Sequence, residues 1–309
     1  MKVIVLGSAA GGGFPQWNCN CENCRRARAK DPAAVRRTQS SLAITTTGAC
    51  WHLLNASPDV RQQLQSTPSL HPRRGVRDSP VAGVVLTNAD VDHVAGLLSL
   101  RESQPLVVYA TRRVLAALAA NPVFDVLRRD IVARIPLELD IETALAGPDA
   151  ACSGITVEAF AVPGKVALYL EDPAAGADFG TVWEDTVGLK VSEPATGRFF
   201  YYIPACARLS GEVAERIKGA PLVLFDGTTW TDDEMRSSGA GIKTVGRMGH
   251  MSITGAGGSM AAFAALAVQR KIFIHINNTN PVLLADSPER ALTEAAGWEI
   301  AFDGMEIDV

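Results

Sequence analysis

The sequence predicts a layered α/β sandwich, and three observations support this fold class. Short apolar, β-branched runs bounded by glycine, proline or polar residues recur along the whole chain, as is typical of strands. Segments with alanine and leucine at helical spacing separate several of these runs. Hydrophobic residues make up 47% and charged residues 20% of the 309 residues, as in an ordinary folded protein. Because there is no internal repeat or linker, we expect one domain over 1–309.

The N-terminal half is expected to start with a strand that enters a glycine-rich loop at residues 8–13. A hairpin is expected around Thr47-Gly48-Ala49, which separates two apolar runs. The expected strands of this half are 1–7, 41–46, 50–54, 81–87 and 106–110. The expected helices are 59–64, a helix starting at 95–100, and 111–120.

The C-terminal half repeats the alternation of strands and helices. The expected strands are 155–162, 166–171, 186–191, 198–203, 222–225 and 271–276. Helices are expected at 258–270 and 289–296, on either side of the last of these strands. Strand-rich halves flanked by helices indicate a layered sandwich.

Composition argues against two classes of partner. The net charge of −4 argues against nucleic acid, because a phosphate-binding surface normally shows a basic excess. The first residues reach glycine after four apolar residues, too soon for a signal peptide, and no later stretch approaches the about 20 apolar residues of a membrane span. We therefore expect a cytoplasmic protein with no nucleic-acid and no membrane partner. The sequence leaves the oligomeric state open.

A cysteine cluster suggests a structural metal site. Cys19, Cys21 and Cys24 lie in a loop at about 14–30, and three thiolates at this spacing suit tetrahedral zinc with a fourth ligand from elsewhere. Reduced cysteines without a metal are the alternative. The zinc would hold the long loop that follows the first strand. The single cysteines at 50, 152 and 206 are expected to be buried thiols.

Three candidate metal ligands follow the apolar run 81–87 within four residues. They are Asp90, Asp92 and His93, and carboxylates and imidazoles are common metal ligands. A solvated loop with an N-cap aspartate is the alternative. The segment resembles the HxHxDH motif of metallo-β-lactamase-fold hydrolases, with Asn88 and Asp90 in place of the first two histidines. That resemblance implies a four-layer αββα sandwich.

The resemblance also implies which residues hold the metal. Asp92 and His93 match the end of the motif, and His275, at the end of a predicted strand, matches the family's late metal histidine. One carboxylate and two imidazoles are the ligand set of a non-heme iron(II) centre. The family's mid-chain histidine and bridging aspartate have no counterpart at the expected places. We therefore expect one ion, with Asp90 as an outer-shell or fourth ligand.

The chain also resembles the PQQ (pyrroloquinoline quinone) biosynthesis protein B family, nearly from end to end. The resemblance rests on residues 7–21, 55–59, 87–93 and 275–281. It implies an iron(II)-dependent hydroxylase, with O₂ as cosubstrate, that acts on the tyrosine ring of the cross-linked Glu-Tyr intermediate of PQQ. Zinc could occupy the same ligands. The alternatives are a carrier of PQQ or its precursor toward the periplasm, and a single-metal hydrolase.

Further side chains are candidates for catalysis and substrate binding. We expect His250, after a glycine-rich loop, to act with Asp90 in catalysis, although an N-cap or packing role also suits His250. Lys165 and Arg247 are expected to bind a zwitterionic amino-acid substrate, and Asp226, at a strand end, could also approach it. A solvated loop for Lys165 and a turn for Asp226 are the alternatives.

Overall fold

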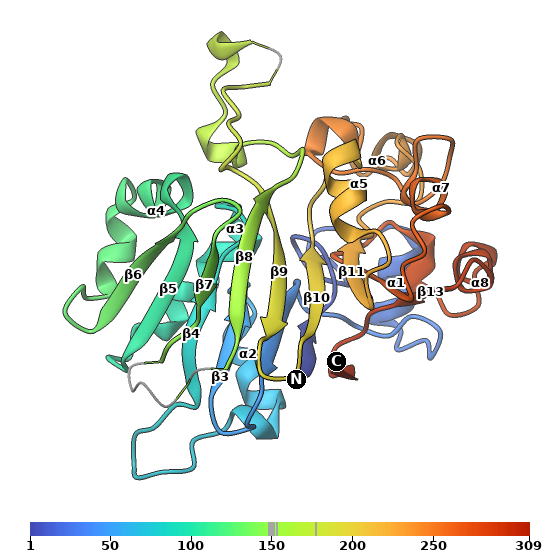
Figure 1. Ribbon diagram of the computed structural model, residues 1–309. Coiled ribbons are helices and arrows are strands. Elements are labelled where there is room, and N and C mark those ends of the chain that lie inside the picture. Colours follow the sequence, from blue (N-terminus) through green and yellow to red (C-terminus); the bar gives the residue numbers. More distant parts are fainter. Residues whose placement is uncertain (148–151, 153, 177) are drawn as a thin grey trace.

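The computed structural model describes residues 1–147, 152, 154–176 and 178–309. Within them, the first seven-stranded sheet has the order β14-β1-β2-β3-β4-β5-β6 (Figure 1). Its strands are β1 (Lys2–Gly7), β2 (Ser41–Thr45), β3 (Trp51–Leu54), β4 (Val81–Val85), β5 (Leu106–Thr111), β6 (Val132–Leu137) and β14 (Glu306–Asp308). The strands from β14 to β3 pair antiparallel, and those from β3 to β6 pair parallel.

The second sheet of the described residues also has seven strands, in the order β13-β12-β11-β10-β9-β8-β7. They are β7 (Glu142–Ala144), β8 (Thr156–Ala161), β9 (Val187–Glu193), β10 (Arg198–Ile203), β11 (Leu222–Asp226), β12 (Arg270–Ile274) and β13 (Trp298–Ile300). Here the strands from β7 to β10 pair antiparallel and those from β10 to β13 pair parallel. Both sheets therefore combine an antiparallel half with a parallel half.

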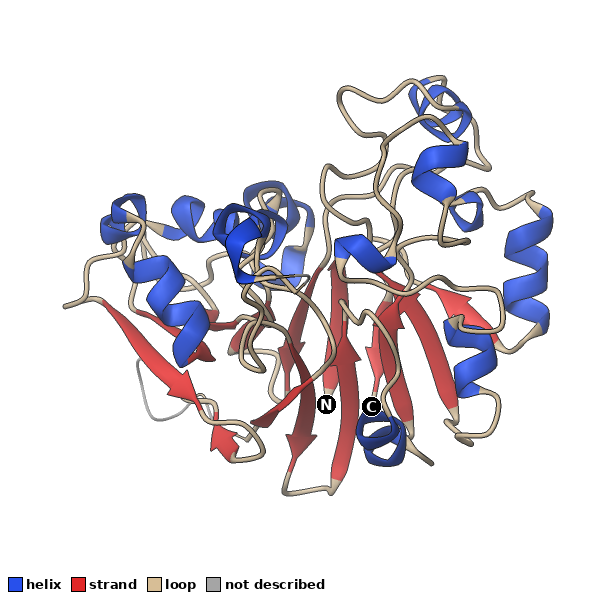
Figure 2. Ribbon diagram, turned by 90° about the horizontal axis from the view of Figure 1, so that it is seen from above, coloured by secondary structure: helices blue, strands red, loops and turns tan. Residues whose placement is uncertain are grey.

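The helices are short, and groups of them lie at the sides of the layered strands (Figure 2). They are α1 (Glu22–Arg28), α2 (Val60–Ser66), α3 (Val91–Val94), α4 (Arg112–Ala119), α5 (Gly211–Ile217), α6 (Glu234–Ser237), α7 (Ser259–Phe263) and α8 (Pro288–Ala295). In the part of the chain that the structure describes, no helix has the length and apolar character needed to cross a lipid bilayer.

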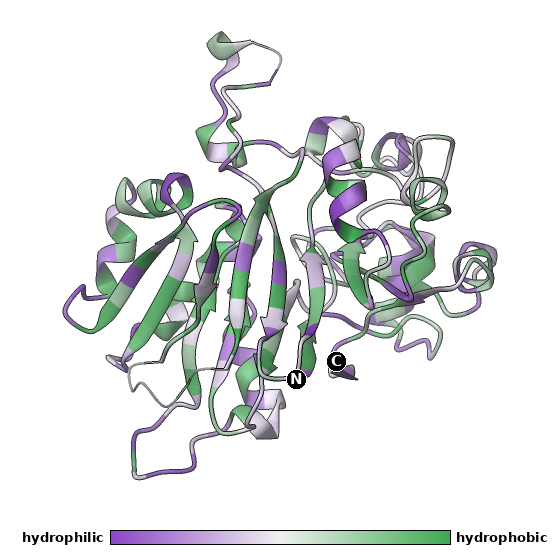
Figure 3. Ribbon diagram, in the orientation of Figure 1, coloured by the Kyte–Doolittle hydropathy of each residue, from purple (hydrophilic) through white to green (hydrophobic). Residues whose placement is uncertain are grey.

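Side chains of β1 show how the layers form. Val3 and Val5 belong to a buried cluster shared by the two sheets, whereas Ile4 and Leu6 belong to the cluster on the outer face of the first sheet. Successive side chains of a strand point to opposite faces, so β1 contributes to two layers. Both faces of β1 are therefore apolar, and green segments run along many of the strands in Figure 3. With helices outside both sheets, the expected four-layer αββα sandwich is confirmed.

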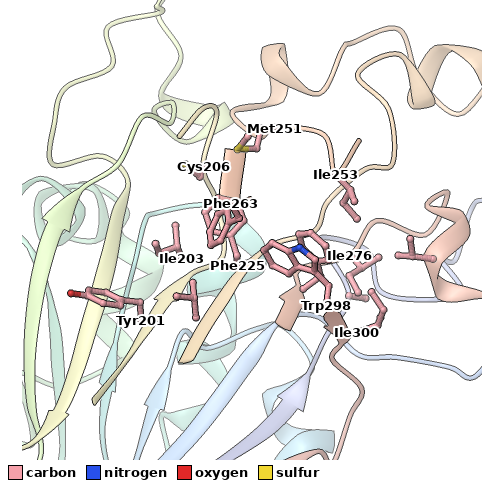
Figure 4. Packing of buried hydrophobic residues seen from close by; sticks show 14 of the residues in the cluster. Tyr201, Ile203, Cys206, Phe225, Met251, Ile253, Phe263, Ile276, Trp298 and Ile300 are labelled. Atoms are coloured by element: carbon pink, nitrogen blue, oxygen red, sulfur yellow. The ribbon is translucent and has the colours of Figure 1, made fainter. Parts of the chain in front are cut away.

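An aromatic cluster packs helix α7 against the outer face of the second sheet (Figure 4). Phe263 of α7 contacts Phe225 of β11 and Trp298 of β13, with ring centroids 4.8 Å and 4.9 Å away. Trp298 also stacks on Phe273 of β12 at 3.8 Å. Aromatic pairs of this kind add to the stability gained from burial, so the cluster fixes the strands that end at the candidate site.

Two expected elements are wrong. Residues 166–171 were expected to be a strand, but they contain only the 3-10 helix Leu168–Leu170. This apolar segment leaves the sheet between β8 and β9, in the yellow-green excursion at the top of Figure 1. The helix expected over 258–270 is limited to α7. The expected helix start at 95–100 is a 3-10 helix, Ala95–Leu100, that continues α3.

The expectation of free thiols is wrong for two of the single cysteines. Cys50 and Cys152 form a disulfide with their Cα atoms 5.5 Å apart, across a sequence separation of 102 residues. Sequence spacing does not reveal such a pair, because the fold alone brings the two positions together. Cys206 is a buried free thiol, as expected.

Candidate metal centre

The candidate metal centre lies where strands of both sheets end. Asp92 and His93 belong to α3, which follows β4 of the first sheet. Asp226 is the last residue of β11, and His275 directly follows β12, the parallel neighbour of β11. The carboxyl ends of parallel strands share one edge of a sheet, where ligands usually bind. A cavity of about 310 Å³ is lined by Asp92, His93 and His275 together with His250.

Asp92, His93 and His275 form the first group of possible metal donors. One ligand atom from each lies within 4.8 Å of the other two. His275 Nε2 is 3.0 Å from Asp92 Oδ2, and the rings of His93 and His275 are 5.3 Å apart in an edge-on arrangement. The structure thus brings together the three residues that the sequence suggested as iron ligands.

The surroundings of His93 suit a metal ligand. Its Nδ1 atom donates to Asn88 Oδ1 across 2.7 Å, so the neutral ring has a lone pair on Nε2. Nε2 is buried and has no hydrogen-bond partner among the described residues. Burial lowers the pKa of His93 to about 4, which keeps the imidazole neutral. A buried nitrogen without a partner is costly, and a bound divalent ion would satisfy it.

Asp92 and His275 supply complementary charge. Burial opposes ionisation of Asp92, but the neighbouring His93 and His275 rings lower its pKa overall. Burial also opposes protonation of His275, yet its hydrogen bond with Asp92 raises its pKa. A Cβ atom at Gly11 would lie 3.2 Å from Asp92 Oδ2, so glycine lets the first loop lie close to this carboxylate. Oδ2 of Asp92 faces Nε2 of His275, the nitrogen that would bind a metal.

A second group of possible donors consists of Asp226, His250 and His275. His250 Nδ1 is 2.7 Å from Asp226 Oδ2, and the rings of His250 and His275 stack at 5.0 Å. Thr228 links the group, because its hydroxyl donates to Asp226 Oδ1 at 2.6 Å and lies 3.0 Å from His275 Nδ1. His275 Nδ1 can therefore donate to Thr228, which leaves Nε2 on the side of Asp92.

Asp226 is placed differently from the substrate contact that the sequence suggested. Its carboxylate is fully buried and accepts hydrogen bonds from the backbone nitrogens of Cys206 (2.9 Å) and Thr228 (3.0 Å). His250 Nδ1 also contacts Oδ2, and the Thr228 hydroxyl donates to Oδ1, so both oxygens of Asp226 already have partners. Its position instead orients His250.

Asp90 lines the cavity beside Asp92 but belongs to neither donor group. Burial and the Asp92 charge raise the pKa of Asp90. Its backbone nitrogen donates to Asn88 Oδ1 at 3.0 Å, so the same amide oxygen holds both Asp90 and His93 in place. The raised pKa agrees with a role in proton transfer.

Lys165 and Arg247 share one carboxylate, Glu171. Arg247 donates two hydrogen bonds to Glu171, at 3.0 Å and 2.7 Å, and its guanidinium lies 3.8 Å from the ring centroid of Phe179. Lys165 Nζ is 3.4 Å from the same carboxylate. The hydrogen bond from Arg247 lowers the pKa of Glu171 to about 2, so the carboxylate is charged. Both cations line an adjoining cavity of about 720 Å³.

The cysteine cluster forms a second candidate metal site. The sulfur atoms of Cys19, Cys21 and Cys24 lie within 4.8 Å of one another. A hydrogen bond from the Cys24 thiol lowers the pKa of Cys21 to about 5, which favours a thiolate at neutral pH. The Asn278 side-chain amide is 3.1 Å, 3.7 Å and 3.3 Å from the three sulfur atoms in chain order. The Asn278 side chain therefore lies beside all three sulfur atoms.

Sequence reasoning missed several residues of the metal centre. Thr228 was passed over, although its position two residues after Asp226 at a strand end could have indicated it. Gly11 was noted only as part of a glycine-rich loop. Glu171 and Lys243 carry no local pattern, and only the fold places Glu171 beside two cations and Lys243 on the cavity wall.

Comparison with known proteins shows which family the chain resembles. The family described as "Beta-lactamase superfamily domain" matches residues 50–276. The chain is 57% identical over 310 residues to coenzyme PQQ synthesis protein B of Gluconacetobacter diazotrophicus, with 99% of each chain covered. It is 52% identical over 309 residues to the protein of the same name from Methylorubrum populi, with 100% of each covered.

Two solved structures resemble this chain. Zn(2+)-bound PqqB from Methylobacterium extorquens superposes with a TM-score of 0.94 at 50% identity, and each chain is covered to 100%. A diphosphatase from the PhnP family gives a TM-score of 0.67 at 19% identity over 99% of this chain and 96% of that one. The similarity to the diphosphatase shows only that the two proteins share a fold.

Proposed function

Because the chain belongs to the coenzyme PQQ synthesis protein B family, within the β-lactamase superfamily, we propose that it is an iron(II)- and O₂-dependent hydroxylase in PQQ biosynthesis. Its substrate is the cross-linked Glu-Tyr intermediate, whose tyrosine ring gains oxygen. The observation that supports this most is the convergence of Asp92, His93 and His275 on one point of the cavity. Proteins use one carboxylate and two imidazoles to hold iron(II) with open positions.

The donor set fits a single divalent ion. His93 offers an unpartnered Nε2 atom, His275 directs Nε2 toward Asp92, and Asp92 contributes the negative charge. Bound there, iron(II) would supply the reaction with O₂ that ring hydroxylation needs. The hydrogen bonds from Nδ1 of both histidines, to Asn88 and Thr228, keep the rings oriented.

Asp90 and His250 are the groups that we assign to proton transfer. Both line the cavity, so either can reach a phenolic hydroxyl of a bound substrate. The raised pKa of Asp90, caused by burial and by Asp92, suits a carboxyl group that takes up and releases a proton. Asp226 holds His250 through Nδ1, which leaves Nε2 for the substrate.

Oxygen consumption tests this function. The anaerobically prepared, iron-loaded protein should consume O₂ when the cross-linked Glu-Tyr compound and a reductant are added, and the product should contain added oxygen by mass spectrometry. The zinc-loaded protein serves as the control, because zinc has no redox chemistry. Binding of the compound without O₂ uptake by the iron-loaded protein would contradict hydroxylation.

One observation favours a second candidate, a metal-assisted hydrolase. The donors Asp226 and His250 share His275 with the first group, so a single ion could be held by either group. A single ion there could activate water for attack on a substrate bond. Such an enzyme would release products without consuming O₂. A carrier of PQQ or its precursor would bind its ligand and release it unchanged.

We also propose that the cysteine cluster holds a structural zinc ion with Asn278 as fourth ligand. Amide oxygen and nitrogen differ only by a rotation of the side chain, so the Asn278 oxygen can face the three sulfur atoms. Cys24 lies in α1 and Asn278 lies in the segment after His275, so the ion would link these two parts of the chain. The zinc would therefore stabilise the chain next to the active-site histidine.

A further inference from the structure

The wall of the metal-centre cavity carries two lysines, Lys165 and Lys243. Lys165 Nζ is 3.4 Å from Glu171, which is also held by Arg247. Lys243, in contrast, has no ion-pair partner among the residues that the structure describes. Lys165 and Arg247 thus share one carboxylate, whereas Lys243 faces the cavity without a paired carboxylate in the described part of the chain.

The backbone on both sides of Lys243 is held in place. The carbonyl of Ile242 accepts a hydrogen bond from Arg236 Nε at 2.8 Å. The backbone nitrogen of Val245 donates to the Asp232 carbonyl at 2.9 Å. Lys243 is therefore presented from an anchored loop, and it loses less conformational freedom on binding than a residue of an unanchored loop.

The other charges of the cavity determine what Lys243 can recognise. Asp90 and Asp92 lie on the side of the donor group, whereas Lys243 is a cation on the wall of the same cavity that no described carboxylate pairs. An ammonium group attracts a carboxylate and forms a charge-assisted hydrogen bond with it. A substrate with both a carboxylate and an aromatic ring would thus be oriented by its charge.

We propose that Lys243 binds the carboxylate of the tyrosine part of the substrate, so that the aromatic ring faces Asp92, His93 and His275. This inference rests on the proposed function and identifies the substrate as an aromatic amino-acid derivative held by its carboxylate. Lys165 and Arg247 are positioning residues, because they hold the segment around Glu171 and Phe179 beside the cavity.

A binding experiment tests the role of Lys243 without turnover. Zinc-loaded full-length protein is titrated calorimetrically with the cross-linked Glu-Tyr compound and with an analogue that lacks the carboxylate of the tyrosine part. Lys243→Met should weaken binding of the full compound by about tenfold, and Lys243→Arg should retain most of the affinity. The matched control is Lys218→Met, which removes the same charge from a surface pair with Glu215; its affinity should equal that of the wild type.

The analogue separates a direct contact from an indirect effect. If Lys243 binds the tyrosine carboxylate, the wild type should lose about tenfold in affinity for the analogue, while Lys243→Met should bind both compounds equally. Unchanged affinity of Lys243→Met for the full compound, at wild-type metal content, would overturn the proposal. If this variant does not fold, equal affinity of the wild type for both compounds would overturn it. Absence of O₂ uptake with an intact binding pattern would instead count against hydroxylation alone.

Discussion

His93 Nδ1 lies 2.7 Å from the side-chain oxygen of Asn88, five residues earlier in the chain. Because an amide oxygen can only accept, this contact places the ring proton on Nδ1 and the lone pair on Nε2. Nε2 is the buried atom without a partner. The asparagine that stands in place of a motif histidine therefore prepares a neighbouring histidine to bind a metal, and it need not contact the ion itself.

Removal of this contact should weaken metal binding. Asn88→Ala is expected to lower the affinity of the metal centre by about 10- to 100-fold, because His93 loses the group that orients it. Asn88→Asp, which keeps an acceptor oxygen, should remain closer to the wild type. Anaerobic iron titration against a chromophoric chelator measures the affinity. Asn121→Ala, at the end of α4, is the control. Equal iron affinity of Asn88→Ala and the wild type would exclude a role of Asn88 in orienting His93.

The two acidic residues of the motif should differ in their effect on metal content. Asp92→Ala and His275→Ala should each remove one ion per chain, because each removes a donor of the same group. Asp90→Ala should keep the ion and lose activity, since Asp90 lies outside both donor groups. Elemental analysis measures the ion content, and circular dichroism verifies the fold. A full ion content in both Asp92→Ala and His275→Ala would disprove the ligand assignment.

The cysteine cluster should determine stability. Cys21→Ser should lose the structural zinc and lower the melting temperature by about 5 °C or more, because metal binding stabilises only the folded chain. Asn278→Ala should weaken zinc binding, and Asn278→His should retain it, since histidine is a common fourth ligand. Cys206→Ser, at a buried thiol outside the cluster, is the control. An unchanged zinc content in Cys21→Ser would show that Cys21 does not bind zinc.

Glu234 should make stability depend on pH. Burial raises the pKa of this carboxyl group to about 7, although Thr279 and the Trp230 backbone nitrogen each donate to it at 2.5 Å. A raised pKa means that the folded state binds the proton more tightly than the unfolded chain. The free energy of unfolding therefore falls as the pH rises from about 4.5 to about 7, by at most about 3 kcal/mol from this group.

Glu234→Gln should remove that contribution, because the amide does not titrate. Urea unfolding at several pH values between 5 and 8 should show a flatter decline for the variant than for the wild type. Glu215→Gln, at an exposed surface pair, should leave the decline unchanged. Identical pH profiles of Glu234→Gln and the wild type would show that Glu234 does not cause this decline in stability.

Much of the fold follows from local sequence patterns, and the errors have identifiable causes. The strands around residues 81–87 and 222–225 were expected from their continuous apolar runs. In the structure both strands are buried on both faces. Residues 166–171 have a similar apolar run, and Val166 and Ala167 are indeed buried, but the segment packs beside the sheets and not in them. A short apolar run indicates burial and does not by itself determine the conformation.

The sequence by itself determined the kinds of metal donor: a triplet of thiols, and an aspartate and histidine directly after a buried strand. Such features depend on neighbours along the chain, whose geometry the backbone repeat fixes. The family resemblance implied that His275 joins Asp92, but only the tertiary structure showed their contact across 183 residues. It alone decided that Asp226 holds His250, and that Lys165 and Arg247 share the carboxylate of Glu171. Contacts at such separations depend on how the two sheets pack, because pairing across the fold is set by the burial of apolar faces and not by spacing in the sequence.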